Sequence, residues 1–230
     1  LAKEFPQIGI RISIEGLELL KTKFDLGFSF PPFGQFSSDN SFKYIEQVVV
    51  KQLLDNVQGR FCFITSTAFT FATGNMSNGR KESVFSNRLK AVVGLPGGFV
   101  PYTGINCVAL FFDKYDKNQD SLMIMDLSKK ECKDQVNSSR YQLVFSDYAI
   151  ECLADGLEGK ESDVAKKVSF TELSDNDYIL TPSNYVLSQE EELARKQILA
   201  GDIKLSDVVE IYRAQASKTE ESGETFYEIN

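Results

Sequence analysis

The stretch FDLGFSFPPFG, residues 24–34, decides the fold that this sequence predicts. Its first seven residues are mostly apolar and predict a buried β-strand, and the prolines at 31 and 32 end that strand in a turn followed by an aromatic residue. Because strands rise about 3.3 Å per residue, such a strand crosses a typical sheet and carries the turn to its carboxyl edge. In open α/β folds that edge is where ligands bind.

The sequence after this stretch alternates between helical and extended patterns. Residues 41–57 place apolar side chains at helical spacing, and residues 61–65 predict the next strand. Residues 65–79 are rich in Ser, Thr, Gly and Asn and predict a mobile loop over the site. Residues 82–89 predict a helix that leads into a strand at 91–95.

The second half continues with strands before it becomes helical. Residues 106–112 and 121–126 are β-rich runs joined by a polar connection, which predicts an antiparallel hairpin. Residues 141–153 predict a helix, and residues 168–173 and 178–180 predict a late ordered tail. The whole pattern is α/β.

Taken together, these segments resemble the methylation (M) subunit of type I restriction-modification systems, in the N-6 adenine DNA methyltransferase family. The match runs from about residue 12 to residue 186. After the Pro-Pro-Phe turn it includes the strand RFCFI at 60–64, the "GLP" turn of VVGLP at 92–96, and the "TGI" hairpin entry of YTGINCVAL at 102–110. On their own, the two prolines would fit an ordinary strand-ending turn equally well.

The resemblance implies the C-terminal part of a Rossmann-like S-adenosylmethionine-dependent methyltransferase fold, with a mostly parallel sheet and a terminal antiparallel hairpin. It also implies a catalytic loop at Phe30, Pro31, Pro32 and Phe33. The two prolines would hold backbone carbonyls toward the target amine, and Phe33 would stack on an extruded adenine.

Phe30 departs from the family pattern, which has Asn or Asp at this position to accept a hydrogen bond from the amine. A buried amine without its partner costs about 1 to 3 kcal/mol. Since 1.36 kcal/mol is about tenfold in rate, we expect methyl transfer to be about ten- to a hundredfold slower. Ser29 is a poor substitute, because neighbouring side chains of a strand point to opposite faces.

The cofactor implied by the resemblance is S-adenosylmethionine, which methyltransferases of this type bind with a glycine-rich turn. The sequence contains no Gly-x-Gly-x-x-Gly, and the three glycines between Gly94 and Gly98 fit the "GLP" turn better. The comparison with the family puts Leu1 downstream of the cofactor strands, and the chain begins without Met. We therefore expect a fragment whose complete parent binds the cofactor and which does not bind it well alone.

Composition restricts the other chemistry. The chain has 230 residues, 42% hydrophobic and 25% charged, which is typical of a globular protein. Its four cysteines are widely spaced and it has no histidine, so we expect no metal site and no His-dependent nucleophile. Cys62 and Cys107 lie in apolar runs and predict small core residues. The cysteine spacing and the lack of a leader or an apolar span favour a cytoplasmic protein away from the membrane.

The charge is unevenly distributed along the chain. The net charge is −8, yet residues 1–110 carry 11 basic and 8 acidic side chains, and the remainder carries 14 basic and 25 acidic ones. Arg80, Lys81, Arg88 and Lys90 cluster in the mildly basic half, before the strand at 92, and could face a DNA backbone. A solvated helix face is the alternative interpretation.

Three parts are predicted along the chain: the catalytic-loop half of a methyltransferase domain at 1–128, its C-terminal tail at 129–187, and a helical linker at 188–230. The tail ends in an "L-x-P-x-x-Y-V" phrase at 180–186 that resembles the end of the M subunit. Residues 203–211 and 223–230 resemble the start of a specificity subunit's target-recognition domain, with a solvated C-terminal helix as the alternative.

Two hypotheses for function follow. The first is a fragment of an adenine-specific DNA methyltransferase of a restriction-modification system, with double-stranded DNA and the specificity and restriction subunits as partners. The second is a non-catalytic module of such a system that contributes DNA contact or subunit assembly. The family resemblance supports the first hypothesis and favours a methyltransferase family member by descent, whereas Phe30, the acidic second half and the missing cofactor turn support the second.

Overall fold

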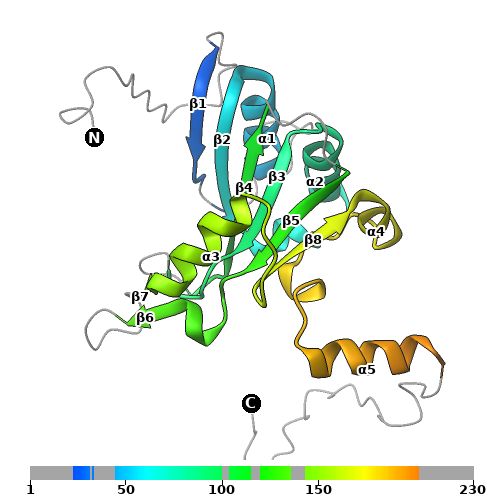
Figure 1. Ribbon diagram of the computed structural model, residues 1–230. Helices are drawn as coiled ribbons and strands as arrows, with labels where there is room; N and C mark the ends of the chain where they lie inside the picture. The colour runs from blue at the N-terminus through cyan, green and yellow to red at the C-terminus, as the bar shows by residue number, and fades with distance from the viewer. Residues whose placement is uncertain are drawn as a thin grey trace, which may run out of the picture. The chain divides into compact units, whose positions relative to one another are not determined.

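Figure 1 shows the protein as a computed structural model, which describes residues 23–31, 33, 45–99, 104–114, 120–135 and 143–201. The chain separates into two units, residues 1–187 and residues 188–230, which are described in turn. Pro32 and the predicted recognition-domain segments at 203–211 and 223–230 lie outside the described residues.

The first unit is built on a six-stranded sheet with the order β1-β2-β4-β3-β5-β8. Strands β1, β2, β3 and β5 run parallel to one another, whereas β4 and β8 run antiparallel to them. The strands are β1 (Phe24–Ser29), β2 (Val57–Ser66), β3 (Leu89–Gly94), β4 (Cys107–Asp113), β5 (Ser121–Asp126) and β8 (Ala165–Ser169). A separate antiparallel pair is formed by β6 (Lys133–Gln135) and β7 (Leu143–Phe145). The predicted α/β class and mostly parallel sheet are confirmed.

The predicted hairpin is wrong, although both of its strands exist. β4 and β5 do not pair, because β3 lies between them and pairs antiparallel with β4 and parallel with β5. The long polar connection after β4 lets the chain cross to the far side of β3. The antiparallel strand β4 therefore lies inside the sheet.

Helices cover the two faces of the sheet. The helical elements of this unit are α1 (Ile45–Asn56), η1 (Thr67–Thr70), α2 (Asn75–Phe85), η2 (Lys130–Cys132), α3 (Asp147–Leu157), α4 (Phe170–Asp175) and η3 (Pro182–Asn184). The helix predicted at 41–57 is confirmed as α1. The loop predicted at 65–79 is wrong for most of its length, because η1 and the first turns of α2 occupy it. The helix predicted at 141–153 is confirmed only in part, since residues 143–145 form β7.

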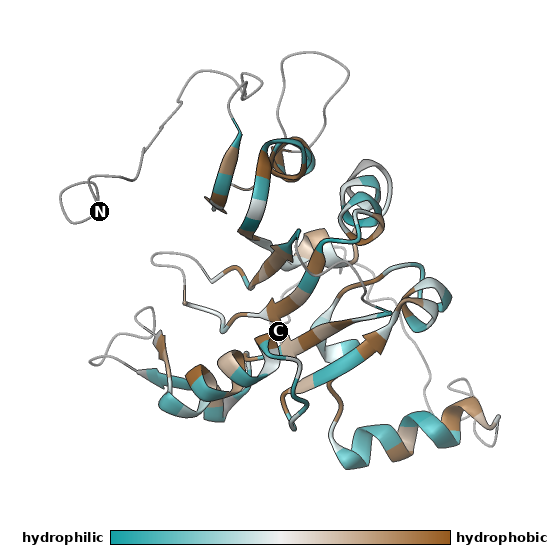
Figure 2. Cartoon of the chain, turned by 45° about the horizontal axis from the view of Figure 1, so that its top comes forward, coloured by the Kyte–Doolittle hydropathy of each residue, from teal (hydrophilic) through white to brown (hydrophobic). Residues whose placement is uncertain are grey.

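The core has two clusters, one on each face. The first joins Val50 and Leu53 of α1 to the sheet residues Phe61, Phe63 and Leu110. The second joins Ala149 and Cys152 of α3 to sheet residues such as Ala91, Val93 and Met125. In Figure 2 the central strands are largely brown, as expected for a sheet with side chains buried on both faces.

β1 is a strand as predicted, but the prediction that it is buried is wrong. Leu26 is 75% exposed and Phe28 is 69% exposed. Among the strands that the structure describes, β1 is the terminal one of its sheet and pairs with β2 alone. Gly27 faces α1, because a Cβ there would lie 2.8 Å from Val57 Cγ2 and 2.9 Å from Phe61 Cβ. Alternation then places Leu26 and Phe28 on the opposite face.

The second unit contributes α5 (Gln189–Leu199), which lies within the segment predicted as a helical linker at 188–230. Ser188 and Glu191 form a reciprocal capping box at its start. None of its residues is buried, and it is mostly hydrophilic in Figure 2. Within the described parts of both units, no helix has the length and apolarity needed to cross a membrane.

Candidate active site

The carboxyl ends of the four parallel strands define one edge of the sheet. Ser29 ends β1, Ser66 ends β2, Gly94 ends β3 and Asp126 ends β5. Phe30 and Pro31 follow β1 directly, so the Pro-Pro segment starts at this carboxyl edge. The segment's position is therefore the one in which open α/β sheets bind ligands.

Phe30 and Phe33 form an aromatic pair at the start of this segment. Their ring centroids lie 5.7 Å apart with an interplanar angle of 69°, an edge-to-face arrangement. Phe33 is half-buried against the second core cluster, whereas Phe30 is 42% exposed. Ser29 shares its strand face with Gly27 and lies away from Phe30. The described part of the loop thus presents aromatic rings and backbone, with no side-chain oxygen at position 30.

The segment after β2, which forms η1, lies at the same carboxyl edge of the sheet. The backbone N–H and the hydroxyl of Thr67 both donate to the carbonyl of Asn106, at 2.9 and 2.8 Å. The buried hydroxyl of Thr70 donates to the Thr67 carbonyl at 2.7 Å and lies 2.9 Å from the hydroxyl of Thr181. These bonds fix η1 to the start of β4 and to the tail.

Arg80 of α2 is buried and binds the segment that follows β2. It is 1% exposed, and its Nη1 donates to the carbonyls of Ala72 at 2.7 Å and Phe69 at 3.4 Å. Its Nε has no hydrogen-bond partner among the described residues. Burial lowers the pKa of Arg80, and the nearby carboxylate of Asp177 acts in the opposite direction.

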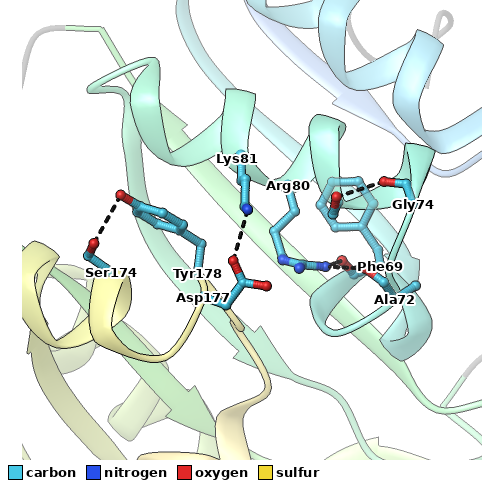
Figure 3. A network of polar contacts seen from close by, with 9 residues as sticks. Phe69, Ala72, Gly74, Arg80, Lys81, Ser174, Asp177 and Tyr178 are labelled. Carbon is cyan, nitrogen blue, oxygen red and sulfur yellow. Dashed lines mark hydrogen bonds and ion pairs between the residues drawn. The ribbon is translucent and has the colours of Figure 1, made fainter.

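Lys81 ties the same helix to the turn after α4 (Figure 3). Its Nζ lies 2.8 Å from Asp177 Oδ1 and 5.7 Å from the ring centre of Tyr178. The hydrogen bond from Lys81 lowers the pKa of Asp177. Asp177 and Tyr178 both have left-handed backbones, with φ of 50° and 55°, a strained conformation for residues other than glycine. The N–H of Tyr178 donates to the Leu173 carbonyl at 2.7 Å and helps to hold this turn.

The "GLP" turn lies between β5 and the tail. A Cβ at Gly94 would lie 3.2 Å from Pro182 Cγ and 3.3 Å from Asp126 Oδ1. Asp126 is buried, and its Oδ1 accepts hydrogen bonds from the N–H of Ser128 at 3.1 Å and its hydroxyl at 2.6 Å. A Cβ at position 94 would therefore make a tight contact with both neighbours, and Pro182 or Asp126 would have to shift by a few tenths of an ångström to admit it.

Arg88 and Lys90 lie at the opposite edge of the sheet from Phe30, because they stand at the amino end of β3. Arg88 donates to the carbonyls of Leu54 and Gly59, both at 3.0 Å, and its guanidinium lies 5.3 Å from the ring centre of Phe61. Burial lowers its pKa. Lys90 is half-buried. The structure therefore divides the predicted DNA-binding cluster between two regions, and it uses both arginines to bind backbone carbonyls.

Asp126 and the contact between Thr70 and Thr181 were not predicted from the sequence. A carboxylate directly after the apolar run of β5 is a sequence signal for a residue at the carboxyl edge. The contact between Thr70 and Thr181 spans 111 residues and has no local signal.

The cysteines lie in protein interiors, as predicted for Cys62 and Cys107. Cys107 is buried and Cys62 is half-buried, and all four cysteines are free. Burial raises the pKa of Cys62 to about 11 and that of Cys132 to about 11. Their thiols are poor nucleophiles at neutral pH. Among the described residues, no three His, Cys, Asp or Glu side chains gather as a metal site.

The sheet order, with an antiparallel strand inserted among parallel ones and an aromatic Pro-Pro segment at the carboxyl edge, defines a methyltransferase-like α/β protein. Residues 23–194 match the family model for N-6 DNA Methylase. This match covers most of the sequence, and the chain belongs to the N-6 DNA methylase family.

Solved structures have the same fold. The methyltransferase subunit of a type I restriction-modification system from Streptococcus thermophilus superposes with a TM-score of 0.60 at 19% identity, over 76% of this chain and 40% of that one. The EcoKI M protein of a type I restriction enzyme superposes with a TM-score of 0.54 at 15% identity, over 78% of this chain and 49% of that one. The chain thus spans less than half the length of these structures. A search of curated proteins gives no significant match.

Proposed function

We propose that this chain forms the catalytic-loop part of an adenine-specific DNA methyltransferase of a restriction-modification system. The observation that carries the proposal is the emergence of Phe30, Pro31 and Phe33 at the carboxyl edge of the sheet in a member of the N-6 DNA methylase family. The solved chains of the same fold are named as subunits of type I systems, which supports that setting.

Each residue of the loop has a proposed role. Phe33 stacks on an extruded adenine, an interaction worth about 1 to 3 kcal/mol per base. Its packing against the second core cluster supports this role, because a ring held in place loses little freedom on binding. Pro31 and Pro32 restrain the backbone that faces the target amine. S-adenosylmethionine, when bound by the complete parent, supplies the methyl group.

Phe30 makes the native protein a slow or silent methyltransferase. Its ring occupies the position where the family has a hydrogen-bond acceptor, and it packs edge to face on Phe33. An amine at this position has no side-chain oxygen to receive its hydrogen. We expect transfer at least about tenfold slower than in a variant with an amide there, since one missing hydrogen bond costs about 1 to 3 kcal/mol.

The experiment is transfer of labelled methyl from S-adenosylmethionine to unmethylated DNA by the complete parent protein. The native form and Phe30→Asn are measured side by side, with Phe85→Asn, which replaces an exposed ring on α2, as the matched control. We expect transfer to rise with Phe30→Asn and to stay unchanged with Phe85→Asn. Full activity in the native form would contradict the role assigned to Phe30.

The second candidate function is a non-catalytic module for DNA contact or subunit assembly. The aromatic pair favours it, because two rings without an acceptor bind a base and do not activate its amine. Silence in both the native form and Phe30→Asn would favour this candidate over the first.

The proposed partners are double-stranded DNA and the specificity and restriction subunits, in the cytoplasm. Direct phosphate contact suits Lys81 better than Arg80, whose guanidinium is buried. DNA binding by Arg80, Lys81, Arg88 and Lys90 stays a prediction. The salt dependence of DNA affinity in Lys81→Gln tests its strongest member, because loss of one phosphate contact lowers the salt slope by about one.

A further inference from the structure

Phe71 is an exposed aromatic residue on the segment that follows β2. Strand β2 ends at Ser66, η1 occupies Thr67–Thr70, and Phe71 is the next residue. Its side chain is 51% exposed, whereas the ring of Phe69, two residues earlier, is fully buried. Phe30, which follows β1 at the same carboxyl edge of the sheet, is the other half-exposed ring of this comparison. The edge at which we place the DNA therefore presents a second aromatic side chain to solvent.

The geometry of η1 explains why the Phe71 ring faces solvent. Side chains that are three residues apart lie on the same side of a 3₁₀ helix. Phe69 and Ala72 both pack against the first core cluster, and the Phe69 ring meets that of Phe63 edge to face at 5.7 Å. Phe71 lies between these two inward residues, so its side chain points away from the core.

The backbone on both sides of Phe71 is fixed by hydrogen bonds. The buried Arg80 donates to the carbonyl of Ala72, one residue after Phe71, at 2.7 Å (Figure 3). The carbonyl of Thr70, one residue before Phe71, accepts the N–H of Leu180 at 2.9 Å. A ring on a backbone that is already fixed loses little freedom when it binds, which favours its use in recognition.

Phe71 and Phe33 belong to opposite faces of the same sheet edge. Phe33 packs against the second core cluster, whereas Phe69 and Ala72, the neighbours of Phe71, pack against the first. In the proposed function, Phe33 holds the extruded adenine. Phe71 is then left to contact the duplex from which the adenine has come.

Extrusion of a base leaves a gap in the duplex and costs the stacking energy of that base with its neighbours. Proteins that distort DNA insert apolar side chains such as Phe between base steps. We propose that Phe71 enters the gap left by the extruded adenine and stacks on the bases that border it. Phe71 is thereby a positioning residue, because it hinders the return of the adenine and does not touch the reacting atoms. The inference rests on the proposed function and adds a residue that holds the DNA in its distorted form.

The experiment measures binding of the complete parent protein to two short duplexes by fluorescence anisotropy. One duplex carries a single abasic site, which presents the gap without the adenine, and the other is the same duplex intact. The variants are Phe71→Ala and Phe71→Trp, and the matched control is Phe85→Ala, which removes an exposed ring from α2. We expect the native protein and Phe85→Ala to bind the abasic duplex about tenfold more tightly than the intact one, because stacking on an aromatic ring favours the gapped form.

Phe71→Ala should lose most of this preference and keep its affinity for the intact duplex, whereas Phe71→Trp should retain the preference because an indole also stacks on bases. A 2-aminopurine placed beside the abasic site should fluoresce more in the Phe71→Ala complex than in the native complex, because stacking quenches this base. The melting temperature of free Phe71→Ala should stay close to the native value, since the ring is half-exposed. A purely structural role of Phe71 would not produce this combination.

An unchanged preference in Phe71→Ala would overturn the inference. Equal loss of affinity for both duplexes, or the same loss of preference in Phe85→Ala, would also overturn it. A native protein that transfers methyl groups but binds the two duplexes equally would overturn the role of Phe71 and leave the proposed function intact. A preference that depends on Phe71 in a protein that transfers no methyl would support the inference and favour the non-catalytic module. A native protein that binds neither duplex would overturn both.

Discussion

β1 and β5 are strands of six residues with similar apolar content, yet the protein treats them differently. In β1, Leu26 and Phe28 are largely exposed, whereas Met123 and Met125 on the same face of β5 are buried. β5 lies between β3 and β8 and beneath α3, while β1 has one neighbour and no described helix on this face. The apolar pattern thus specifies a strand, and the neighbours specify its burial.

Truncation of the buried Met123 in β5 and of the exposed Phe28 in β1 should give the largest difference in the free energy of unfolding. Met123→Ala leaves a cavity in the second core cluster and should lower the free energy of unfolding by about 2 to 5 kcal/mol. Phe28→Ala removes an exposed ring and should change it by about 0.5 kcal/mol or less. Urea unfolding followed by circular dichroism measures both. If Phe28→Ala lowered the free energy of unfolding as much as Met123→Ala does, the side chain of Phe28 would have to be covered in the free chain.

The comparison extends to buried and exposed cations. Arg80→Met keeps the shape of the side chain but leaves the carbonyls of Ala72 and Phe69 without their charged donor, and hydrogen bonds to charged groups are worth about 1.5 to 3 kcal/mol. Lys51→Met breaks an exposed ion pair with Glu82 and should cost about 1 kcal/mol or less. Hydrogen exchange should show faster opening of η1 only in Arg80→Met. Equal hydrogen exchange of η1 in the two variants would contradict the role of Arg80 in holding η1 in place.

The smallest effect is expected from two cysteines, the half-buried Cys62 in β2 and the buried Cys132 in η2. Burial raises the pKa of Cys62 and of Cys132 to about 11, so both thiols should react slowly with N-ethylmaleimide at pH 8 and faster as the pH approaches 11. Both pKa values are raised, so we expect access to decide the order, and the half-buried Cys62 should react before the buried Cys132. Mass spectrometry of labelled peptides gives both rates. Faster labelling of Cys132 than of Cys62 would contradict the deeper burial of Cys132.

The same shifts fix the sign of a pH effect on stability. Each folded thiol holds its proton more tightly than the unfolded thiol, whose pKa is near 9. The stability contribution is therefore fully present below pH 9 and is lost as the pH rises toward 11. Cys62→Ala removes one of these thiols and should therefore reduce the loss of stability at alkaline pH. Removal of this thiol's titration should not affect stability near neutral pH, where the thiol is protonated in both states.

Local patterns predicted most of the elements. The strands at 91–95, 106–112 and 121–126 are apolar runs that are largely buried on both faces of the sheet, whereas the strand at 61–65 is buried on the α1 face and half-buried on the other. The predicted helix at 41–57 contributes apolar residues to the first core cluster as α1. The pairing of β3 with both β4 and β5 was not predictable in this way, because it joins segments whose order in the sheet differs from their order in the chain.

The candidate site likewise combines features that the local sequence predicts with features that depend on distant segments. The arrival of Phe30 and Pro31 at the carboxyl edge follows from the strand and turn pattern of residues 24–34. The burial of Arg80 does not, since its partners are the backbone carbonyls of residues 69 and 72, in a segment that contacts the tail through Thr70 and Thr181, far apart in the sequence. The sequence indicated a charged surface cluster, whereas in the structure the buried Arg80 and the half-buried Arg88 donate to backbone carbonyls, and both lysines are half-buried.

The tail sets an order for synthesis of this protein. The N–H of Leu180 donates to the Thr70 carbonyl at 2.9 Å, and Tyr185 and Val186 are buried in the first core cluster. Since these are among the last residues of the first unit to leave the ribosome, the cluster stays unsealed until nearly all of the unit has been made. A nascent chain arrested before residue 180 would expose both the end of this cluster and the side chains of Leu26 and Phe28 on β1, and it would be a substrate for chaperones at two separate surfaces.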